Sequence, residues 1–273
     1  MTKTFITRTI SALVAVLIIF GIYYFLRIPG LKILCYLAVF MGSLELIRIL
    51  LPKEIHKTHK VLFCAVLMLI FHIAANAPSF LVIAFPLAFI VFMVLSIMAH
   101  QGFAELETMV RYQGASVLGF VYLGLLPSYA YRLLDLKHGL GWFSTLLVVV
   151  FAGDIGAYLL GVLIGKNKVL PRLSPKKTWE GSLGGLVGST LAGYGCSYFL
   201  PEIQLNTLLI MALCAGFVAQ FGDFFESLLK RTAGVKDSGR IMPGHGGVLD
   251  RLDGVLFASP IILLVASLFE AGL

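Results

Sequence analysis

Long apolar runs constrain this chain more than any other feature of its sequence. Short polar segments separate nine such runs, at residues 9–26, 31–51, 61–77, 80–99, 114–132, 140–164, 182–200, 205–229 and 248–269. A helix needs about 20 apolar residues to cross the hydrocarbon core of a bilayer. Because helices satisfy all their backbone hydrogen bonds internally in lipid, the runs predict an all-α, polytopic transmembrane bundle of about nine spans.

The composition excludes a water-soluble globular protein. Apolar residues make up 59% of the chain and charged residues 13%, whereas soluble domains are about half apolar and about a quarter charged. The run at 9–26 follows Lys3 and Arg8 like a signal peptide, but it is too long and lacks a small-residue cleavage site, so we expect a retained span. The four cysteines lie singly in apolar segments, which predicts inert thiols and no zinc site or disulfide framework.

The placement of the basic residues predicts the orientation of the spans. With a cytoplasmic N-terminus, all but four of the 21 lysines and arginines fall on the cytoplasmic side, the exceptions being Arg27, Lys32, Arg132 and Lys137. Cytoplasmic loops are enriched in Lys and Arg. The pattern therefore predicts an integral membrane protein whose functional loops face the cytoplasm, and we expect the membrane to be the inner membrane of a bacterium. Topology and anionic lipids explain the net charge of +7 without a nucleic-acid partner.

Acidic residues inside or beside the spans indicate a site, because a charge at the centre of a bilayer costs about 2.5–3.5 kcal/mol even on the lenient scale. Asp223 and Glu226 are three residues apart, and so are Asp250 and Asp253, which places each pair on one helix face. Both pairs flank one basic loop, and Asp154 lies near another. Oxygen ligands suit divalent cations.

The same acids have a structural alternative, in which they form buried ion pairs with Lys230, Arg231 and Arg251. We favour a metal site for Asp223, Asp250 and Asp253. Glu45 lies alone in the second span near Arg48, and for this residue we expect an ion pair.

Two cytoplasmic loops, at 165–181 and 230–247, combine glycines with cations. Glycines let the backbone approach a ligand and present N–H groups to anions, and the segment Ser174 to Lys177 is expected to cap the helix that follows it. His245 stands among glycines as a base, a ligand or a loop-rigidifying residue. Acids that hold metal, cations that hold phosphates and a membrane that supplies lipid together predict phosphoryl or nucleotidyl transfer.

A long pattern in the C-terminal part resembles the signature of the phosphatidate cytidylyltransferases (CDP-diacylglycerol synthases). It comprises Ser227-Leu-Leu-Lys230-Arg231, Lys236-Asp237, Pro243-Gly-His245-Gly-Gly247 and Asp250-Arg251-Leu-Asp253, with Met242 where the family usually has Leu, Ile or Phe. Asp154-Ile-Gly-Ala-Tyr158 and Ser174-Pro-Lys-Lys-Thr-Trp-Glu-Gly181 are similar to the same family. The likeness is specific from about residue 150 onward. It suggests a catalytic region at 114–273 behind an N-terminal region of four spans at 1–113.

The resemblance implies the reaction of CTP with phosphatidate to give CDP-diacylglycerol and pyrophosphate, with Mg²⁺, and the sequence leaves open whether a second cation binds. It implies metal ligands among Asp223, Asp250, Asp253 and Asp154. It implies phosphate binding and catalysis by Lys230, Arg231, Lys236, Asp237, His245 and Arg251. It implies further substrate contacts from Asp154, Tyr158, Lys166, Ser174, Lys176, Lys177, Gly246 and Gly247. Asp237 has two open roles, as a metal ligand or as the partner that orients Lys236.

Two other functions remain open from the sequence. A CTP-dependent polyprenol or lipid-alcohol kinase resembles this family in its C-terminal half, but it needs a base for a hydroxyl nucleophile. A cation-coupled transporter also places acids inside the membrane, near mid-depth. The sequence leaves the oligomeric state open, with a homodimer as one arrangement.

Overall fold

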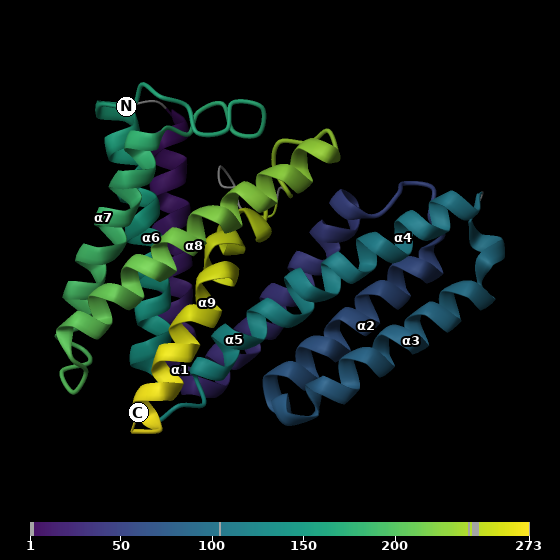
Figure 1. The fold of residues 1–273 in the computed structure, drawn as a ribbon, viewed down its shortest axis with the longest axis horizontal. Helices are drawn as coiled ribbons and strands as arrows, with labels where there is room; N and C mark the ends of the chain where they lie inside the picture. The colour runs from purple at the N-terminus through teal and green to yellow at the C-terminus, as the bar shows by residue number, and fades with distance from the viewer. Residues whose placement is uncertain (1–2, 104, 240, 242–245, 273) are drawn as a thin grey trace. The chain divides into compact units, whose positions relative to one another are not determined.

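The computed structural model describes residues 3–103, 105–239, 241 and 246–272, and all the regular elements in them are helices (Figure 1). The α-helices are α1 (Lys3–Leu50), α2 (Lys57–Asn76), α3 (Leu81–Met98), α4 (Leu106–Gly119), α5 (Leu126–Leu133), α6 (Gly139–Leu163), α7 (Trp179–Cys196), α8 (Leu205–Thr232) and α9 (Leu249–Glu270). Shorter turns are η1 (Pro78–Phe80), η2 (His100–Gly102) and the π-helical η3 (Phe120–Leu125). The predicted all-helical fold is confirmed.

Within the described part of the chain, seven helical segments are long and apolar enough to cross a membrane: Leu17–Leu50, Lys57–Asn76, Pro78–Met98, Leu106–Leu133, Gly139–Leu163, Leu205–Thr232 and Leu249–Glu270. The sequence predicts about nine. The first two predicted spans are the two halves of α1, which counts once. The predicted span at 182–200 corresponds to α7, which is not among these seven segments and in which glycine fills six of the 18 positions.

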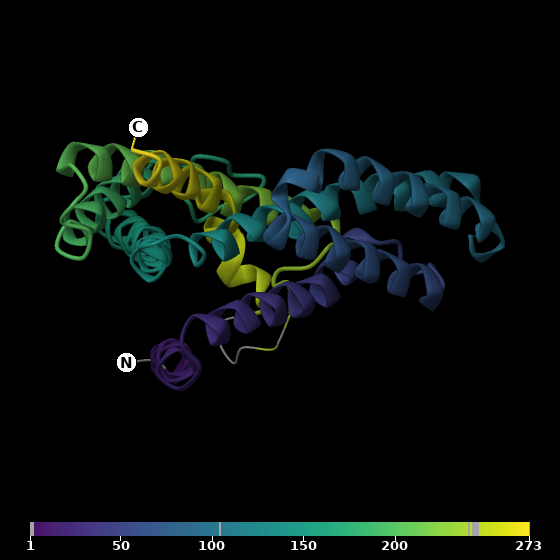
Figure 2. The same cartoon turned by 90° about the horizontal axis from the view of Figure 1, so that it is seen from below.

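Helix α1 breaks in its middle, as Figure 2 shows. Arg27 leaves the helical conformation, with φ 54° and ψ −146°, and Pro29 follows two residues later. Proline cannot donate a backbone hydrogen bond and its ring clashes with the preceding turn, so a helix breaks or kinks beside it. The break lies between the two apolar runs that the sequence separates.

The chain forms two compact units. Unit 1 comprises Met1–Tyr131 with Thr232–Arg251, and unit 2 comprises Arg132–Arg231 with Leu252–Leu273. Unit 1 therefore contains the second basic loop from Thr232 onward, and unit 2 contains the first. The division of function at residue 113 stays a prediction.

In unit 1, α2 lies between α1, α3 and η3 and supplies much of the core (Figure 1). Phe63 of α2 stacks on Phe120 of η3 with 5.5 Å between the ring centroids, and Phe92 of α3 meets Phe120 edge-on at 5.0 Å. All three rings are fully buried. Such aromatic pairs add to the free energy gained from burial.

In unit 2, α6 and α7 run along each other at very short range. A side chain on Gly156 would overlap the backbone of Gly184, and one on Gly184 would overlap that of Gly156. Small residues let helices approach closely and gain van der Waals contact, which is how helices associate in lipid. Gly222 of α8 makes the same kind of approach to the backbone of Asp253 on α9.

Candidate active site

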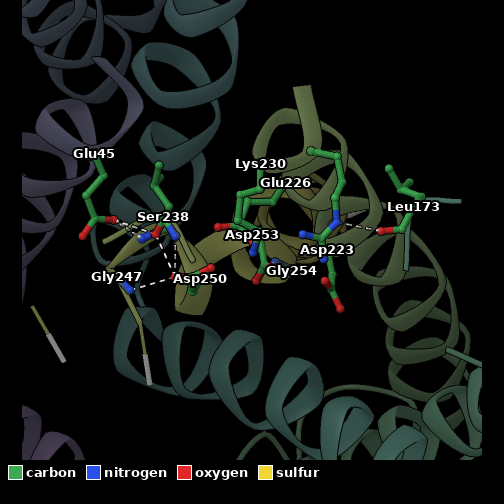
Figure 3. Close-up of polar contacts among 12 residues, drawn as sticks. Glu45, Leu173, Asp223, Glu226, Lys230, Ser238, Gly247, Asp250, Asp253 and Gly254 are labelled. Carbon is green, nitrogen blue, oxygen red and sulfur yellow. Dashed lines mark hydrogen bonds and ion pairs between the residues drawn. The ribbon is translucent and has the colours of Figure 1, made fainter. Parts of the chain in front are cut away.

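Three carboxylates meet in unit 2, where α8 approaches α9. Asp223 and Glu226 lie one turn apart on α8, and Asp253 lies on α9. One oxygen from each lies within 4.8 Å of the others (Figure 3). Glu226 is 1% exposed, and Asp223 and Asp253 are partly buried. Carboxylates this close repel one another unless cations neutralise them, so the cluster suits a divalent cation with oxygen ligands.

Two lysines of the described residues form ion pairs with this acidic cluster. Lys177, from the first basic loop, pairs with Asp223, and its ammonium group also lies 4.2 Å from the centre of the Phe224 ring. Lys230 pairs with Glu226 at 2.5 Å, one turn along α8. The two lysines thus lie against two of the three carboxylates of the cluster. Of the cations named in the structural alternative, Lys230 forms an ion pair with Glu226 here, inside the acidic cluster.

Glu180, near the end of the first basic loop, forms hydrogen bonds with residues at its beginning. The Glu180 carboxylate accepts hydrogen bonds from the backbone N–H of Lys166 (3.1 Å) and Asn167 (3.2 Å) and from the Asn167 side chain (2.8 Å). Its own backbone N–H lowers the pKa of Glu180 most; burial opposes that effect, and the Lys166 and Asn167 N–H groups lower the pKa further. We call this arrangement the Glu180 clasp.

The cap of α7 differs from the sequence expectation. The Thr178 hydroxyl accepts a hydrogen bond from the Gly181 N–H at 3.1 Å, so Thr178 is the N-cap, and not the segment from Ser174 to Lys177. Thr178 precedes the helix with an extended backbone and is buried, which is the usual conformation of a cap. The Arg231 Nε donates to the Leu173 carbonyl at 3.4 Å, which brings the end of α8 to this loop.

A second acidic group lies in unit 1 and combines α1 with the second basic loop (Figure 3). Glu45 accepts hydrogen bonds from the Ser238 hydroxyl and from the backbone N–H of Val248 and Leu249, each at 3.0 Å. Asp250 accepts from the Ser238 N–H at 2.9 Å and the Gly247 N–H at 2.7 Å. The ion pair expected between Glu45 and Arg48 is not among those of the described residues, because the Glu45 carboxylate is directed to backbone N–H groups instead.

The predicted metal ligands are thus placed in different ways. Asp223 and Asp253 come together as the sequence predicts, and Glu226 joins them. Asp250 is bonded to Ser238 and Gly247 in unit 1, and Asp154 lies on α6 with an exposed side chain. The assignment of Asp250 and Asp154 as metal ligands stays a prediction.

The other predicted site residues are mostly exposed. In unit 2 the exposed ones are Tyr158, Lys166, Lys176 and Arg231, while Ser174 and Lys177 are partly buried. In unit 1 the exposed ones are Lys236, Asp237 and Arg251. Gly246 adopts a left-handed backbone with φ 84°, which favours glycine, and Gly247 is buried. His245 lies outside the described residues. The roles given to all of these stay predictions.

Sequence reasoning missed two members of these groups. The sequence already places Glu226 on the same helix face as Asp223, three residues away, but the predicted metal ligands do not include it. Glu45 carries a weaker signal, because it is a single acid within an apolar span. Its hydrogen-bond partner Leu249 lies 204 residues away in the sequence.

Comparison with known proteins gives one family. The pattern of the cytidylyltransferase family matches residues 6–269. A Synechocystis protein named phosphatidate cytidylyltransferase is 34% identical over 93% of this chain and 94% of its own length. Proteins of that name from Mycobacterium leprae and Staphylococcus saprophyticus are 40% and 41% identical, over 54% of this chain and 47% and 56% of their own lengths. The family match includes both basic loops and the acidic cluster.

Proposed function

Because the chain belongs to the cytidylyltransferase family, we propose that it transfers the cytidylyl group of CTP to phosphatidate, which gives CDP-diacylglycerol and pyrophosphate. The relatives that match it bear the name of this activity. The observation that carries the proposal is the cluster of Asp223, Glu226 and Asp253 with Lys177 and Lys230 beside it. This set combines ligands for a cation with cations for phosphates.

The acidic cluster fits a magnesium ion by the chemistry of its donors. All three side chains offer carboxylate oxygens, which a hard cation prefers, and one oxygen of each lies within 4.8 Å of the others. Asp223, Glu226 and Asp253 would hold Mg²⁺, which would neutralise charge on the phosphates of the nucleotide. We also propose that Asp154, in unit 2, and Asp250, in unit 1, are ligands of a cation.

The chemistry needs little more than positioning and charge neutralisation. An oxygen of the phosphatidate phosphate attacks the α-phosphorus of CTP, a new P–O bond forms, the bond to the bridging oxygen breaks, and pyrophosphate leaves with that electron pair. The nucleophile is already an anion, so no general base is required. The work of the protein is to bring two anions together, and preorganised cations do this well. Lys177, Lys230 and Arg231 carry the required charge in unit 2.

We further propose that α1 crosses the membrane twice, that α7 also crosses it, and that the N-terminus is cytoplasmic. The nine spans then place both basic loops on the cytoplasmic side, in agreement with the positive-inside rule. Seven membrane-length segments and the break at Arg27 support this count. The membrane is the inner membrane of a bacterium, from which phosphatidate enters the site laterally.

The two alternative functions are not favoured. A lipid-alcohol kinase would release CDP and put only phosphate on the lipid, and a transporter would not consume CTP. Neither agrees with the name shared by the relatives.

The experiment uses CTP labelled in its cytidine, purified protein in detergent, phosphatidate and Mg²⁺. We expect the label on the lipid, and free labelled CDP or absence of turnover would contradict the proposal. Glu226→Gln should lower turnover by at least about a hundredfold, because it breaks a buried ion pair and removes a charged ligand.

The matched control is Glu107→Gln. Glu107 pairs with Arg111 at the same spacing on α4, but both side chains are exposed. Exposed pairs of this kind contribute little, so this variant should keep turnover within about twofold of the wild type. Equal losses in the two variants would refute the role of the acidic cluster.

A further inference from the structure

Glu45 is an acid buried in an apolar helix, and it lies at the beginning of another helix. It is 1% exposed on α1, and each of its two oxygens accepts a backbone N–H, from Val248 and from Leu249, where α9 begins. The first N–H groups of a helix have no partner within the helix. Hydrogen bonds from such groups to a carboxylate are charge-assisted, and the helix dipole favours the negative charge. Glu45 therefore caps α9 from outside that helix.

The same carboxylate reaches the second basic loop through Ser238. The Ser238 hydroxyl lies 3.0 Å from Glu45 and 2.9 Å from Asp250, and its single proton can be donated to only one of them at a time. The Ser238 N–H and the Gly247 N–H both donate to the oxygen of Asp250 that faces the hydroxyl. The second basic loop thus binds both carboxylates: Ser238 and Gly247 donate to Asp250, and Ser238 also contacts Glu45.

The loop is shaped for this contact. A side chain on Gly247 would overlap the Ser238 hydroxyl and the Glu45 carboxylate, and one on Gly239 would overlap Glu45 as well. Ser238 is 5% exposed and Gly247 is buried, although this segment follows exposed residues such as Lys236 and Asp237. The part of the loop at Glu45 is therefore packed, while the part that carries Lys236 remains open.

We propose that Glu45 is a positioning residue for the reaction: it fixes the second basic loop and the first turn of α9, and through Ser238 it fixes the carboxylate of Asp250. We call this group of contacts the Glu45 clasp. The inference rests on the proposed function, since Asp250 and Lys236 are the residues that it sets in place. It gives a role to the N-terminal region, for which the sequence offers only matching hydropathy.

The substitution Glu45→Gln tests the clasp with little change in shape. An ionised carboxylate accepts hydrogen bonds at both oxygens, whereas an amide presents an NH₂ donor at one of them. In the variant one of the two backbone N–H groups, at Val248 or Leu249, would face another donor. The clasp should therefore open without the loss of side-chain volume.

Hydrogen–deuterium exchange of the purified full-length protein in detergent reads the clasp directly. In Glu45→Gln the amides of Ser238, Val248 and Leu249 should exchange about tenfold faster or more. The amides of Lys166 and Asn167, which Glu180 holds in unit 2, should exchange as in the wild type. Unchanged exchange at Ser238, Val248 and Leu249 would overturn the proposal.

Steady-state kinetics separate positioning from a purely structural role. In Glu45→Gln we expect kcat per folded enzyme to fall about tenfold to a hundredfold, with KM for CTP and phosphatidate changed by less than about threefold. The matched control is Glu54→Gln, an exposed acid in the segment after α1, which should leave kcat unchanged. Faster exchange together with wild-type kcat in Glu45→Gln would refute the positioning role.

A second pair of variants keeps the test decisive if Glu45→Gln does not fold. Ser238→Ala removes the hydroxyl alone and should lower kcat, and Ser238→Thr, which retains a hydroxyl, should restore most of it. Equal kcat in Ser238→Ala and the wild type would overturn the proposal. If the wild-type protein transfers no cytidylyl group, the proposed function fails, but the exchange experiment still decides whether Glu45 holds the loop.

Discussion

The two basic loops are both held by a glutamate that accepts backbone N–H groups, but the two glutamates differ in burial and in distance along the sequence. Glu180 lies 14 residues from its partner Lys166, at the surface of unit 2. Glu45 is buried in unit 1 and lies 193 residues from Ser238 and 204 from Leu249. The first loop is therefore stabilised by a glutamate close to it in the sequence, whereas the second depends on a glutamate of α1, near the other end of the chain.

This difference has an energetic consequence. When a buried donor or acceptor loses its partner, the full desolvation penalty of that group destabilises the protein. An exposed group in the same position forms a hydrogen bond with water instead. Damage to the Glu45 clasp should therefore be much more severe than the same damage to the Glu180 clasp. Three substitutions or conditions test the comparison, beginning with the largest expected effect.

Gly247→Ala should break the Glu45 clasp by overpacking. The new methyl group would overlap the Ser238 hydroxyl and the Glu45 carboxylate, and such crowding costs about 1–3 kcal/mol. We expect kcat to fall by about tenfold to a hundredfold and the thermal midpoint to decrease, as measured by turnover and by a melting curve in detergent. Gly114→Ala is the control, because a side chain there meets open space; a fall of equal size in both variants would contradict this account.

Glu180→Gln should have a smaller effect, since its carboxylate is exposed and water can replace the lost hydrogen bonds. We expect a fall in kcat of about twofold to fivefold and faster exchange of the Lys166 and Asn167 amides, with Ser238 unaffected. Exchange measured by mass spectrometry and turnover with labelled CTP give both values. A loss as large as that in Glu45→Gln would remove the contrast between the two loops.

The Glu180 clasp should also respond to acid. The pKa of Glu180 in the folded protein lies below its usual value of 4.5, so the clasp contributes stability that is fully present above pH 4.5. That stability is lost as the pH falls through the lowered pKa. The protection of the Lys166 and Asn167 amides, corrected for intrinsic exchange, should be constant from pH 7 to about pH 5 and should decrease below that range. Glu180→Gln should show no such decrease, and the same decrease in this variant would exclude Glu180 as its cause.

The sequence predicts most helices well because hydropathy alone marks a segment that lipid can solvate. The runs at 140–164, 205–229 and 248–269 agree within a few residues with α6, α8 and α9. The run at 182–200 also predicts α7, whose small residues pack closely against α6, but α7 is not among the seven membrane-length segments of the described residues. The break in α1 was predicted as a loop between two spans, and the structure resolves it as a kink at Arg27.

The site was predictable in part, for physical reasons. Residues three apart share a helix face, which places Glu226 beside Asp223, and the approach of Asp253 is predicted from its position beside the same basic loop. The Glu45 contact could not be predicted, because no local rule connects residues about 200 positions apart. The sequence favours a local ion pair between Glu45 and Arg48, whereas in the structure the Glu45 carboxylate accepts the N–H groups of Val248 and Leu249.

Metal binding by the acidic cluster is the central claim, and Mn²⁺ binding followed by electron paramagnetic resonance on purified protein tests it most directly. The wild type and Glu107→Gln should bind Mn²⁺ alike, and Asp223→Asn and Asp253→Asn should each weaken binding by about tenfold or more, because each removes a charged ligand. Wild-type affinity in both aspartate variants would contradict the claim.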